Sequence, residues 1–371
     1  MEVAVKKYII LFAILLIVIS KTIFSQQDSL RDNLEALPII SYDSDVGLGY
    51  GGKLFLFDLI GAKESFDFIL FNSTKGEQWY KFIFAYPDFE SRQGTTFPFS
   101  FDFIFEYDKY SKYSSYHPSD YSYYKIGEPT FALSEYDCIY EKVTIGTFFS
   151  RGFSKDFSST LGIQYKSFSL YNLTPASKNI PDVPFDYKNG AEEYFSSFLN
   201  IKTDTRNSYI NPTSGLTMLL EFEYSHNLKS NRVASLRGLA SVCYYQELLV
   251  KDLILALRAS KEKVIPLGKP AHFKSVPIGG NNTVRGIPMD KYLYDNVLLI
   301  NCEMRFPLLW KFGGIVGLDL AEGNTNYFAN HRWLYSVVTG LRLYMDNFIV
   351  RADLGFCDEG TGLYLNFGHL F

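Results

Sequence analysis

The sequence has little of what enzymes and metal proteins need. Its four cysteines are widely spaced and form no C-x-x-C pair, which argues against a metal site and against a disulfide framework. The motifs G-x-S-x-G and H-E-x-x-H are missing, and the five histidines fall mostly in expected loops or at strand ends. We therefore expect a chain that is not an enzyme, with no catalytic residues, no metal and no cofactor. The cysteines are Cys138, Cys243, Cys302 and Cys357.

An excess of positive charge is missing as well. The formal net charge is -4 and the isoelectric point is near 5.8, so nothing indicates a nucleic-acid partner. Although 47% of the residues are hydrophobic, the mean hydropathy is only -0.04, so apolar residues are dispersed among polar ones. Such dispersion suits strands better than membrane helices. The many Phe (33) and Tyr (28) residues fit β-strands and the aromatic girdles of a barrel, although an aromatic soluble β protein would look similar.

The N-terminus reads as a targeting segment. Lys6 and Lys7 precede an apolar run from Tyr8 to Ile19, and small or polar residues follow as far as Ser25. We interpret residues 1–25 as a cleavable signal peptide and residues 26–37 as a short periplasmic segment. The alternative is a membrane anchor, but the run is shorter than the roughly 20 residues of a spanning helix.

From Pro38 onward the chain is a succession of strand candidates separated by turn signals, with no long stretch of helical periodicity. We expect sixteen strands. Their ranges are 38–44, 46–58, 65–73, 80–87, 97–108, 140–154, 158–171, 194–206, 216–225, 233–246, 253–265, 296–307, 312–321, 334–345, 347–356 and 361–371. The longer connections, such as 109–139 and 266–295, fall on one side of this succession, as in a transmembrane barrel whose N-terminus is periplasmic.

The clearest alternation lies between Phe97 and Asp108. Aromatic residues occupy one face of this strand and polar residues the other, which indicates contact with lipid on the aromatic face. The alternative is the inner face of a large soluble sandwich, which would need a second aromatic sheet to cover it.

The stretch from Val276 to Leu308 joins a Gly/Asn-rich loop to a strand with one apolar and one charged face. The loop carries Val284-Arg285-Gly286-Ile287, and the strand ends in Glu303-Met304-Arg305-Phe306-Pro307. This stretch resembles the lid loop and following strand of the BamA/TamA superfamily of outer-membrane barrels, the bacterial surface antigen family. The family's usual form is V-R-G followed by an aromatic residue, where this chain has Ile287.

Three further stretches resemble the same family. The opening P-x-x-S-Y-x-x-x-x-G-x-G-x-G pattern begins at Pro38, a D-T-R turn begins at Asp204, and the last strand ends in Phe371. The resemblance implies a 16-stranded antiparallel transmembrane β-barrel over residues 38–371 with an inward-folded lid loop. We expect a barrel without the periplasmic POTRA domains of full-length members.

The resemblance also implies a site. The lid loop's Arg285, next to Gly286, would pair inside the lumen with Glu303 and Asp319, whereas the alternative is an ordinary solvated loop arginine. Gly362, Gly368 and Phe371 would belong to a terminal strand that forms one side of a weak gate. Separately, Arg342, Asp346, Arg351 and Asp353 read as a mixed-charge lumen wall.

The implied function is assistance to the insertion or translocation of membrane proteins through a seam between the first and last strands. The partners would be outer-membrane lipid, unfolded outer-membrane protein clients and a periplasmic protein, with no nucleic acid. The alternative is a passive small-solute pore or a structural surface antigen. The tyrosine-rich loop 109–139 could be an adhesive surface, but we favour a cap over the pore.

Overall fold

A computed structural model describes residues 34–118, 133–175, 190–229, 234–267, 275–325, 328–345 and 348–371. Residues 34–371 form one compact unit. The expected signal peptide, residues 1–25, and the segment as far as residue 33 lie outside the described residues, as does Asp346.

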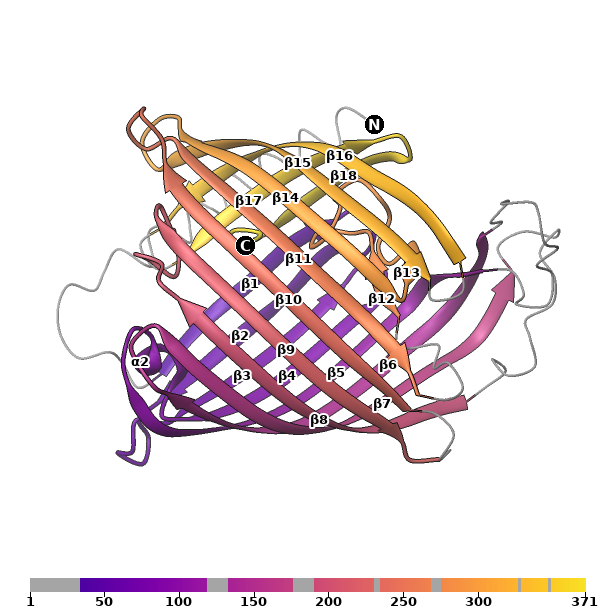
Figure 1. Ribbon diagram of the computed structural model, residues 1–371, viewed down its shortest axis with the longest axis horizontal. Helices are drawn as coiled ribbons and strands as arrows, with labels where there is room; N and C mark the ends of the chain where they lie inside the picture. Colours follow the sequence, from indigo (N-terminus) through magenta and orange to yellow (C-terminus); the bar gives the residue numbers. More distant parts are fainter. Residues whose placement is uncertain are drawn as a thin grey trace. The chain divides into compact units, whose positions relative to one another are not determined.

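Sixteen antiparallel strands close into a barrel, in agreement with the sequence prediction (Figure 1). Each strand pairs with its sequence neighbour in the barrel, and β1 closes the cylinder on β18. The barrel strands are β1 (Leu34–Asp43), β2 (Gly47–Phe57), β3 (Ser65–Ser73), β4 (Glu77–Tyr86), β5 (Phe97–Pro118), β6 (Leu133–Gly152), β7 (Phe157–Pro175), β8 (Gly190–Asp204), β9 (Gly215–Asn227), β10 (Ala234–Glu247), β11 (Ile254–Pro266), β14 (Asn296–Pro307), β15 (Phe312–Thr325), β16 (Phe328–Tyr344), β17 (Ile349–Cys357) and β18 (Gly360–Phe367).

Among the described residues, three short elements lie between barrel strands and were not expected from the sequence. Helix α2 (Phe89–Arg92) follows β4, and Asp88 caps its N-terminus by accepting from the main-chain nitrogens of Glu90 and Ser91. Strands β12 (Val276–Ile278) and β13 (Tyr292–Tyr294) form a separate two-stranded sheet inside the connection from β11 to β14. Among the described residues, no helix is long and apolar enough to cross a membrane.

Two strand boundaries correct the sequence prediction. β1 begins at Leu34, because residues 34–37, expected in the periplasmic segment, pair with β2. β5 and β6 continue their hairpin to the pair Pro118↔Leu133, so much of the expected loop 109–139 is strand. Tyrosine favours strands, and the alternating Tyr and Ser residues allow the ladder to continue. The loop tyrosines Tyr121, Tyr123 and Tyr124 lie outside the described residues.

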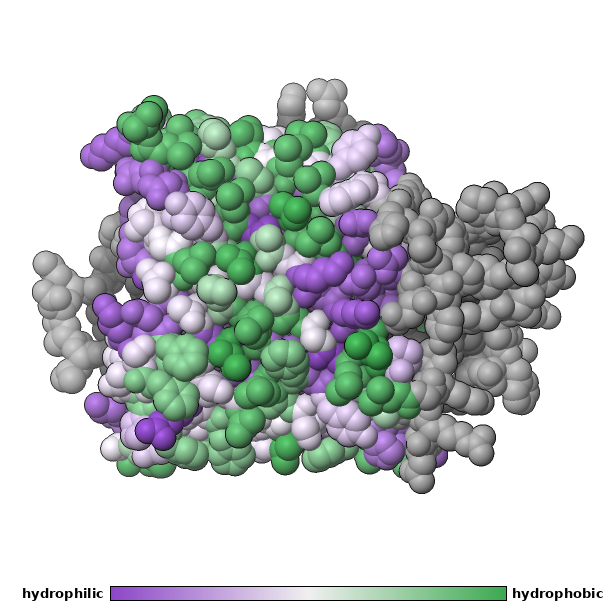
Figure 2. Space-filling model, viewed as in Figure 1, coloured by the Kyte–Doolittle hydropathy of each residue, from purple (hydrophilic) through white to green (hydrophobic). Residues whose placement is uncertain are grey.

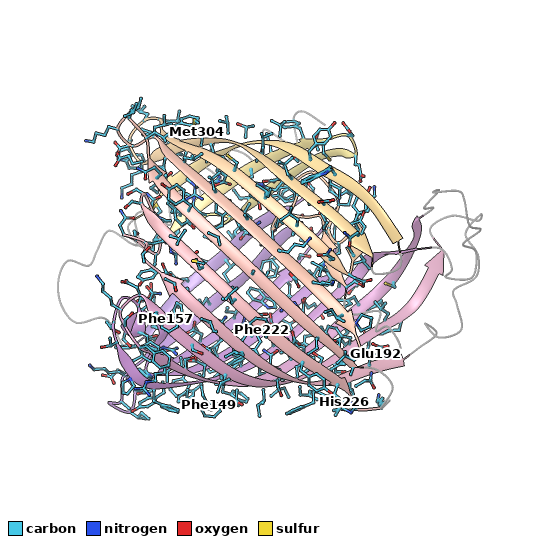
Figure 3. The ribbon with its side chains drawn as sticks, viewed as in Figure 1. Phe149, Phe157, Glu192, Phe222, His226 and Met304 are labelled. Atoms are coloured by element: carbon cyan, nitrogen blue, oxygen red, sulfur yellow. The ribbon has the colours of Figure 1, made fainter. Side chains whose placement is uncertain are left out.

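The two faces of the wall differ in chemistry. Large apolar side chains are exposed on the outside, and those that Figure 3 labels include Phe149, Phe222 and Met304. Figure 2 shows hydrophobic residues over the middle of the visible wall and hydrophilic residues mostly toward its two ends. An apolar outer band with polar ends is the surface that a bilayer-spanning barrel requires.

Aromatic rings form a ladder across neighbouring strands on this outer face. Phe82 of β4 lies 5.0 Å from Phe68 and 6.1 Å from Phe103, and Phe84 lies 6.1 Å from Phe101. The expected aromatic face of β5 therefore packs against equally aromatic strands of the same sheet, and no second sheet covers it among the described strands.

Because the two faces of the wall differ, the same substitution should have unequal effects on stability at two adjacent positions of β10. Val242 is exposed on the outside, whereas Ser241 faces the lumen with Arg237. Val242→Arg should destabilise the folded barrel by about 2–4 kcal/mol, since a guanidinium would enter the bilayer core, and Ser241→Arg should cost much less. Denaturant titration of the barrel in liposomes measures both, and equal losses would show that the faces are misassigned.

Candidate functional site

The segment from Val276 to Tyr294, here called the lid loop, touches the wall on many strands. Asn281 donates to Asp43 of β1 at 2.9 Å, and the main-chain nitrogen of Gly286 donates to the Tyr364 hydroxyl of β18 at 2.9 Å. The main-chain nitrogen of Met289 donates to Asp45, in the turn after β1, at 3.0 Å. These partners lie on the side of the strands opposite the exposed apolar residues, so the loop occupies the lumen.

Arg285 is the centre of these contacts and is completely buried. Its Nε donates to Asp319 Oδ2 at 2.8 Å and its Nη2 to Asp319 Oδ1 at 2.9 Å, which is a two-pronged pair. Its Nη1 donates to both Glu303 Oε1 and Asp353 Oδ2 at 2.9 Å. The main-chain nitrogen of Arg285 also donates to Asp319, at 3.1 Å. One guanidinium thus joins three carboxylates from β14, β15 and β17.

Strand periodicity explains why these acids converge. Asn301, Glu303 and Arg305 alternate along β14 and are buried, whereas Met304 between them is exposed on the lipid side. In the same way Asp319 of β15 and Asp353 of β17 point inward from neighbouring regions of the sheet. The lid arginine therefore meets acids that the pleat has already turned toward it.

Glycine allows the loop to lie directly on the wall. Gly286 has φ +102°, a left-handed conformation, and a Cβ there would meet the main-chain oxygen of Gly355 at 2.9 Å. A Cβ on Gly355 would in turn meet the carbonyl carbon and oxygen of Arg285 at 2.4 Å. Gly362 leaves the space that is taken by the Tyr364 ring, whose hydroxyl binds Gly286.

Apolar packing holds the loop on both sides of the arginine. Val284 and Ile287 are buried in one hydrophobic cluster with Ile278, together with wall residues such as Val297 and Leu334. Ile287, where the family's usual form has an aromatic residue, is only 2% exposed. An aliphatic side chain therefore fills this position of the cluster.

Further polar contacts surround the carboxylates. Asn301 donates to Asp319 at 2.6 Å and to the main-chain oxygen of Thr283 at 2.9 Å. Arg258 of β11 donates to the Asn301 side chain and, at 2.7 Å, to the main-chain oxygen of Asn282. The wall therefore binds the lid loop through hydrogen bonds to its main chain as well as through the ion pairs of Arg285.

Arg285 and Asp45, which both lie outside the strands, have shifted pKa values. Burial alone would lower the pKa of Arg285, but the hydrogen bonds to Asp319 and the charges of Glu303 and Asp353 hold it above its ordinary value. Burial, followed by the nearby charge of Asp43, raises the pKa of Asp45 to about 6. The arginine therefore stays charged throughout the physiological range.

The segment after β18 corrects the expected terminal strand. β18 ends at Phe367, Gly368 takes φ +76°, and the chain turns into the lumen. Phe371 lies with its ring 5.3 Å from the guanidinium carbon of Arg258 and 5.4 Å from that of Arg305, which also donates to the Phe371 main-chain oxygen at 3.0 Å. Gly368 and Phe371 are therefore not part of the seam, because two lumenal arginines attract the aromatic residue.

The seam itself is short. Within the part of the chain that the structure describes, β1 and β18 share two register pairs, Tyr42↔Leu365 and Asp43↔Tyr364, extended by hydrogen bonds between Ser44 and Leu363. On its other side β1 pairs with β2 along its whole length, from Leu34↔Leu56 to Asp43↔Gly47. Of the three residues expected at the gate, only Gly362 lies within a strand that forms the seam.

The structure brings together Arg285, Gly286, Glu303 and Asp319, the expected lid-loop residues. It adds Asp353, which the sequence indicated only as part of a mixed-charge wall, and Tyr364 and Ser336, which binds the Arg285 main-chain oxygen. Alternation along the strand predicted that Asp353 faces the lumen, but nothing in the sequence indicated that it would contact Arg285. Within the described ranges, no group of His, Cys, Asp or Glu residues could hold a metal ion, and Cys243, Cys302 and Cys357 form no disulfide.

The contacts of Arg285 predict that Asp319 dominates the seating of the lid loop. Asp319→Asn should raise hydrogen exchange of the Arg285 and Gly286 amides at least tenfold, because charge-assisted bonds of about 1.5–3 kcal/mol are weakened. Asp67→Asn is the matched control, since Asp67 pairs with Lys53 at 2.7 Å on the distant strands β3 and β2. Exchange measured by mass spectrometry that rises equally in both variants would contradict the assignment.

Known proteins place this geometry in a family. The Omp85 superfamily domain matches residues 68–320, whereas no curated protein matches the chain significantly. The crystal structure of BamA from Haemophilus ducreyi lacking POTRA domains 1–3 is similar, with a TM-score of 0.67 at 12% identity over 91% of this chain and 70% of that one.

Two CdiB structures are also similar in fold. CdiB from Acinetobacter baumannii has a TM-score of 0.56 at 14% identity, and CdiB from Escherichia coli has 0.60 at 10%. Each match covers 92% of this chain but only 61% and 64% of the respective CdiB chains. The family match together with the closed sixteen-stranded barrel confirms the resemblance that the sequence indicated. This chain belongs to the Omp85 superfamily and is a β-barrel of the bacterial outer membrane.

Proposed function

We propose that this barrel assists the insertion or translocation of outer-membrane proteins by opening between β1 and β18. The observation that carries this proposal is the seam, where two register pairs join strands whose other edges are paired along almost their full length. Main-chain hydrogen bonds lost within a bilayer cost several kcal/mol each. A seam with few such bonds is the place where a barrel opens at least cost.

The edge of β1 supports the same role. Within the described strands, residues 34–41 have no strand partner on the side that faces β18. An extended client segment could add to such an edge by main-chain hydrogen bonding, with Pro38 as the one position that lacks a donor. Clients of this chemistry are unfolded outer-membrane proteins, and lipid surrounds the opened seam.

The lid loop would hold the two strands of the seam together while no client is present. It bonds to Asp43 at the end of β1 and to Tyr364 at the same level of β18, so it touches both strands of the seam. A periplasmic partner would deliver clients to the end of the barrel from which residues 368–371 enter. A passive pore or a structural surface antigen remains the competing function, and it needs no opening of the wall.

A reversible covalent bond across the seam distinguishes these functions. Tyr42→Cys with Leu365→Cys places two thiols at directly opposed positions of β1 and β18, within the range of a disulfide. In a background with the four natural cysteines replaced by serine, oxidation should abolish insertion of a model outer-membrane protein into proteoliposomes. Reductant should restore it.

The control is a disulfide elsewhere in the wall. Leu220→Cys with Ala240→Cys links opposed residues of β9 and β10 and should leave insertion unchanged. If the bonded seam inserts clients as fast as the reduced seam, or if no variant exceeds empty liposomes, the insertion function is wrong. Steady conductance in planar bilayers that is indifferent to the seam disulfide would then favour the pore.

A further inference from the structure

Two arginines of the wall compete with Arg285 for its carboxylates. Arg342 Nη2 lies 3.6 Å from Glu303 Oε1, and Arg351 Nη1 lies 3.6 Å from Asp353 Oδ2. These are the same two oxygen atoms that Arg285 Nη1 binds at 2.9 Å. Each oxygen therefore has one guanidinium within hydrogen-bond distance and a second just beyond it.

Arg342 and Arg351 each have N–H groups that are not hydrogen-bonded among the described residues. Among the described residues, no acceptor lies within hydrogen-bond distance of the buried Nε and Nη2 of Arg342 or of the buried Nε and Nη1 of Arg351. Both side chains are almost completely buried, and the two residues oppose each other across β16 and β17. Like charges at opposed positions repel, and buried donors without acceptors are unfavourable, so both arginines gain if a carboxylate oxygen becomes free.

The charges of the wall nearly balance without the lid loop. Arg285 and the three acids that it binds, Glu303, Asp319 and Asp353, are here called the lock. The wall cations around it are Arg258, Arg305, Arg342 and Arg351. Arg305 already binds Glu303 Oε2, with its Nε at 3.1 Å, and Arg342 Nη1 already binds Asp353 Oδ1. Asp319 would keep Asn301, behind which Arg258 lies. Glu303 and Asp353 thus have wall arginines as partners when Arg285 is absent, and Asp319 keeps the hydrogen bond from Asn301.

We propose that Arg342 and Arg351 are built-in replacement partners, which take over Glu303 and Asp353 when Arg285 withdraws. A movement of a fraction of an ångström brings each wall guanidinium into hydrogen-bond distance of the vacated oxygen. The lock then opens without leaving Glu303 or Asp353 unpaired, and an unpaired buried charge is the usual obstacle to breaking a buried ion pair. The inference rests on the proposed function only in that the lid loop must be able to move.

The sign of the effect on the lid loop separates this exchange from a merely structural network. If the wall arginines compete with Arg285, removing them strengthens its hold, so Arg342→Gln and Arg351→Gln should each slow hydrogen exchange of the Arg285 and Gly286 amides at least threefold. If they only support the network, exchange becomes faster. Faster or unchanged exchange in both variants overturns the proposal.

Control variants guard against loss of folding. Arg342→Lys and Arg351→Lys keep the charge and should exchange at nearly the unsubstituted rate, whereas Arg92→Gln breaks a pair with Asp102 at 2.7 Å elsewhere in the barrel and should leave the loop unaffected. Hydrogen exchange is measured only on variants whose unheated sample migrates differently from the heated sample in gel electrophoresis, as a folded barrel does.

A thermodynamic cycle gives a second readout. Arg285→Gln should lower the folding equilibrium constant at least tenfold more in the Arg342→Gln, Arg351→Gln background than in the unsubstituted barrel, since no replacement partners remain. Additive losses would overturn the exchange. Neither measurement uses client insertion, so a failure of the proposed function leaves this result interpretable, and the converse also holds.

Discussion

The structure depends on one buried guanidinium that must not be left without carboxylates. Arg285 has no access to solvent, and three acids from three strands surround it. An arginine cannot shed its charge, and an unpaired charge in a low-dielectric interior is very costly. The pair with Asp319 therefore fixes where the lid loop lies, and the loop in turn fixes the packing of Val284 and Ile287 against the wall.

The same constraint gives the lumen an unusual distribution of charge. The carboxylates are shared between the lid loop and the wall, and the wall carries more guanidinium groups than the acids can fully bind. Because Arg342 and Arg351 lie close to the same carboxylates, the lid loop is held in one position, yet its release costs less free energy than breaking an isolated buried ion pair would. Arg305 extends the arrangement toward the other end of the lumen, since it binds Glu303 and also Phe371.

Main-chain pairing is the second constraint, and it acts on the seam. In lipid every strand edge needs a partner, which is why fifteen of the sixteen junctions have long ladders and the barrel closes at all. At the remaining junction β18 stops pairing with β1 after Leu365. β18 pairs with β17 as far as Phe367, and beyond it the chain leaves the strand and Phe371 is bound by Arg258 and Arg305. The residues after Phe367 therefore add nothing to the seam.

The sequence by itself determined the strands, their two faces and the residues of the lid loop, because alternation along a strand and the Val284-Arg285-Gly286 motif are local properties. Alternation predicted the sixteen strands, and the resemblance of the motif to a known family implied the closed barrel and the meeting of Arg285 with Glu303 and Asp319. Only the tertiary structure decided that Asp353 joins them, that β5 and β6 continue into the expected loop, and that Phe371 leaves the terminal strand. The length of the β5–β6 ladder depends on pairing between the two strands. The contacts of Asp353 and Phe371 depend on which side chains face one another across the lumen, and closure of the barrel sets those neighbours rather than any stretch of adjacent residues.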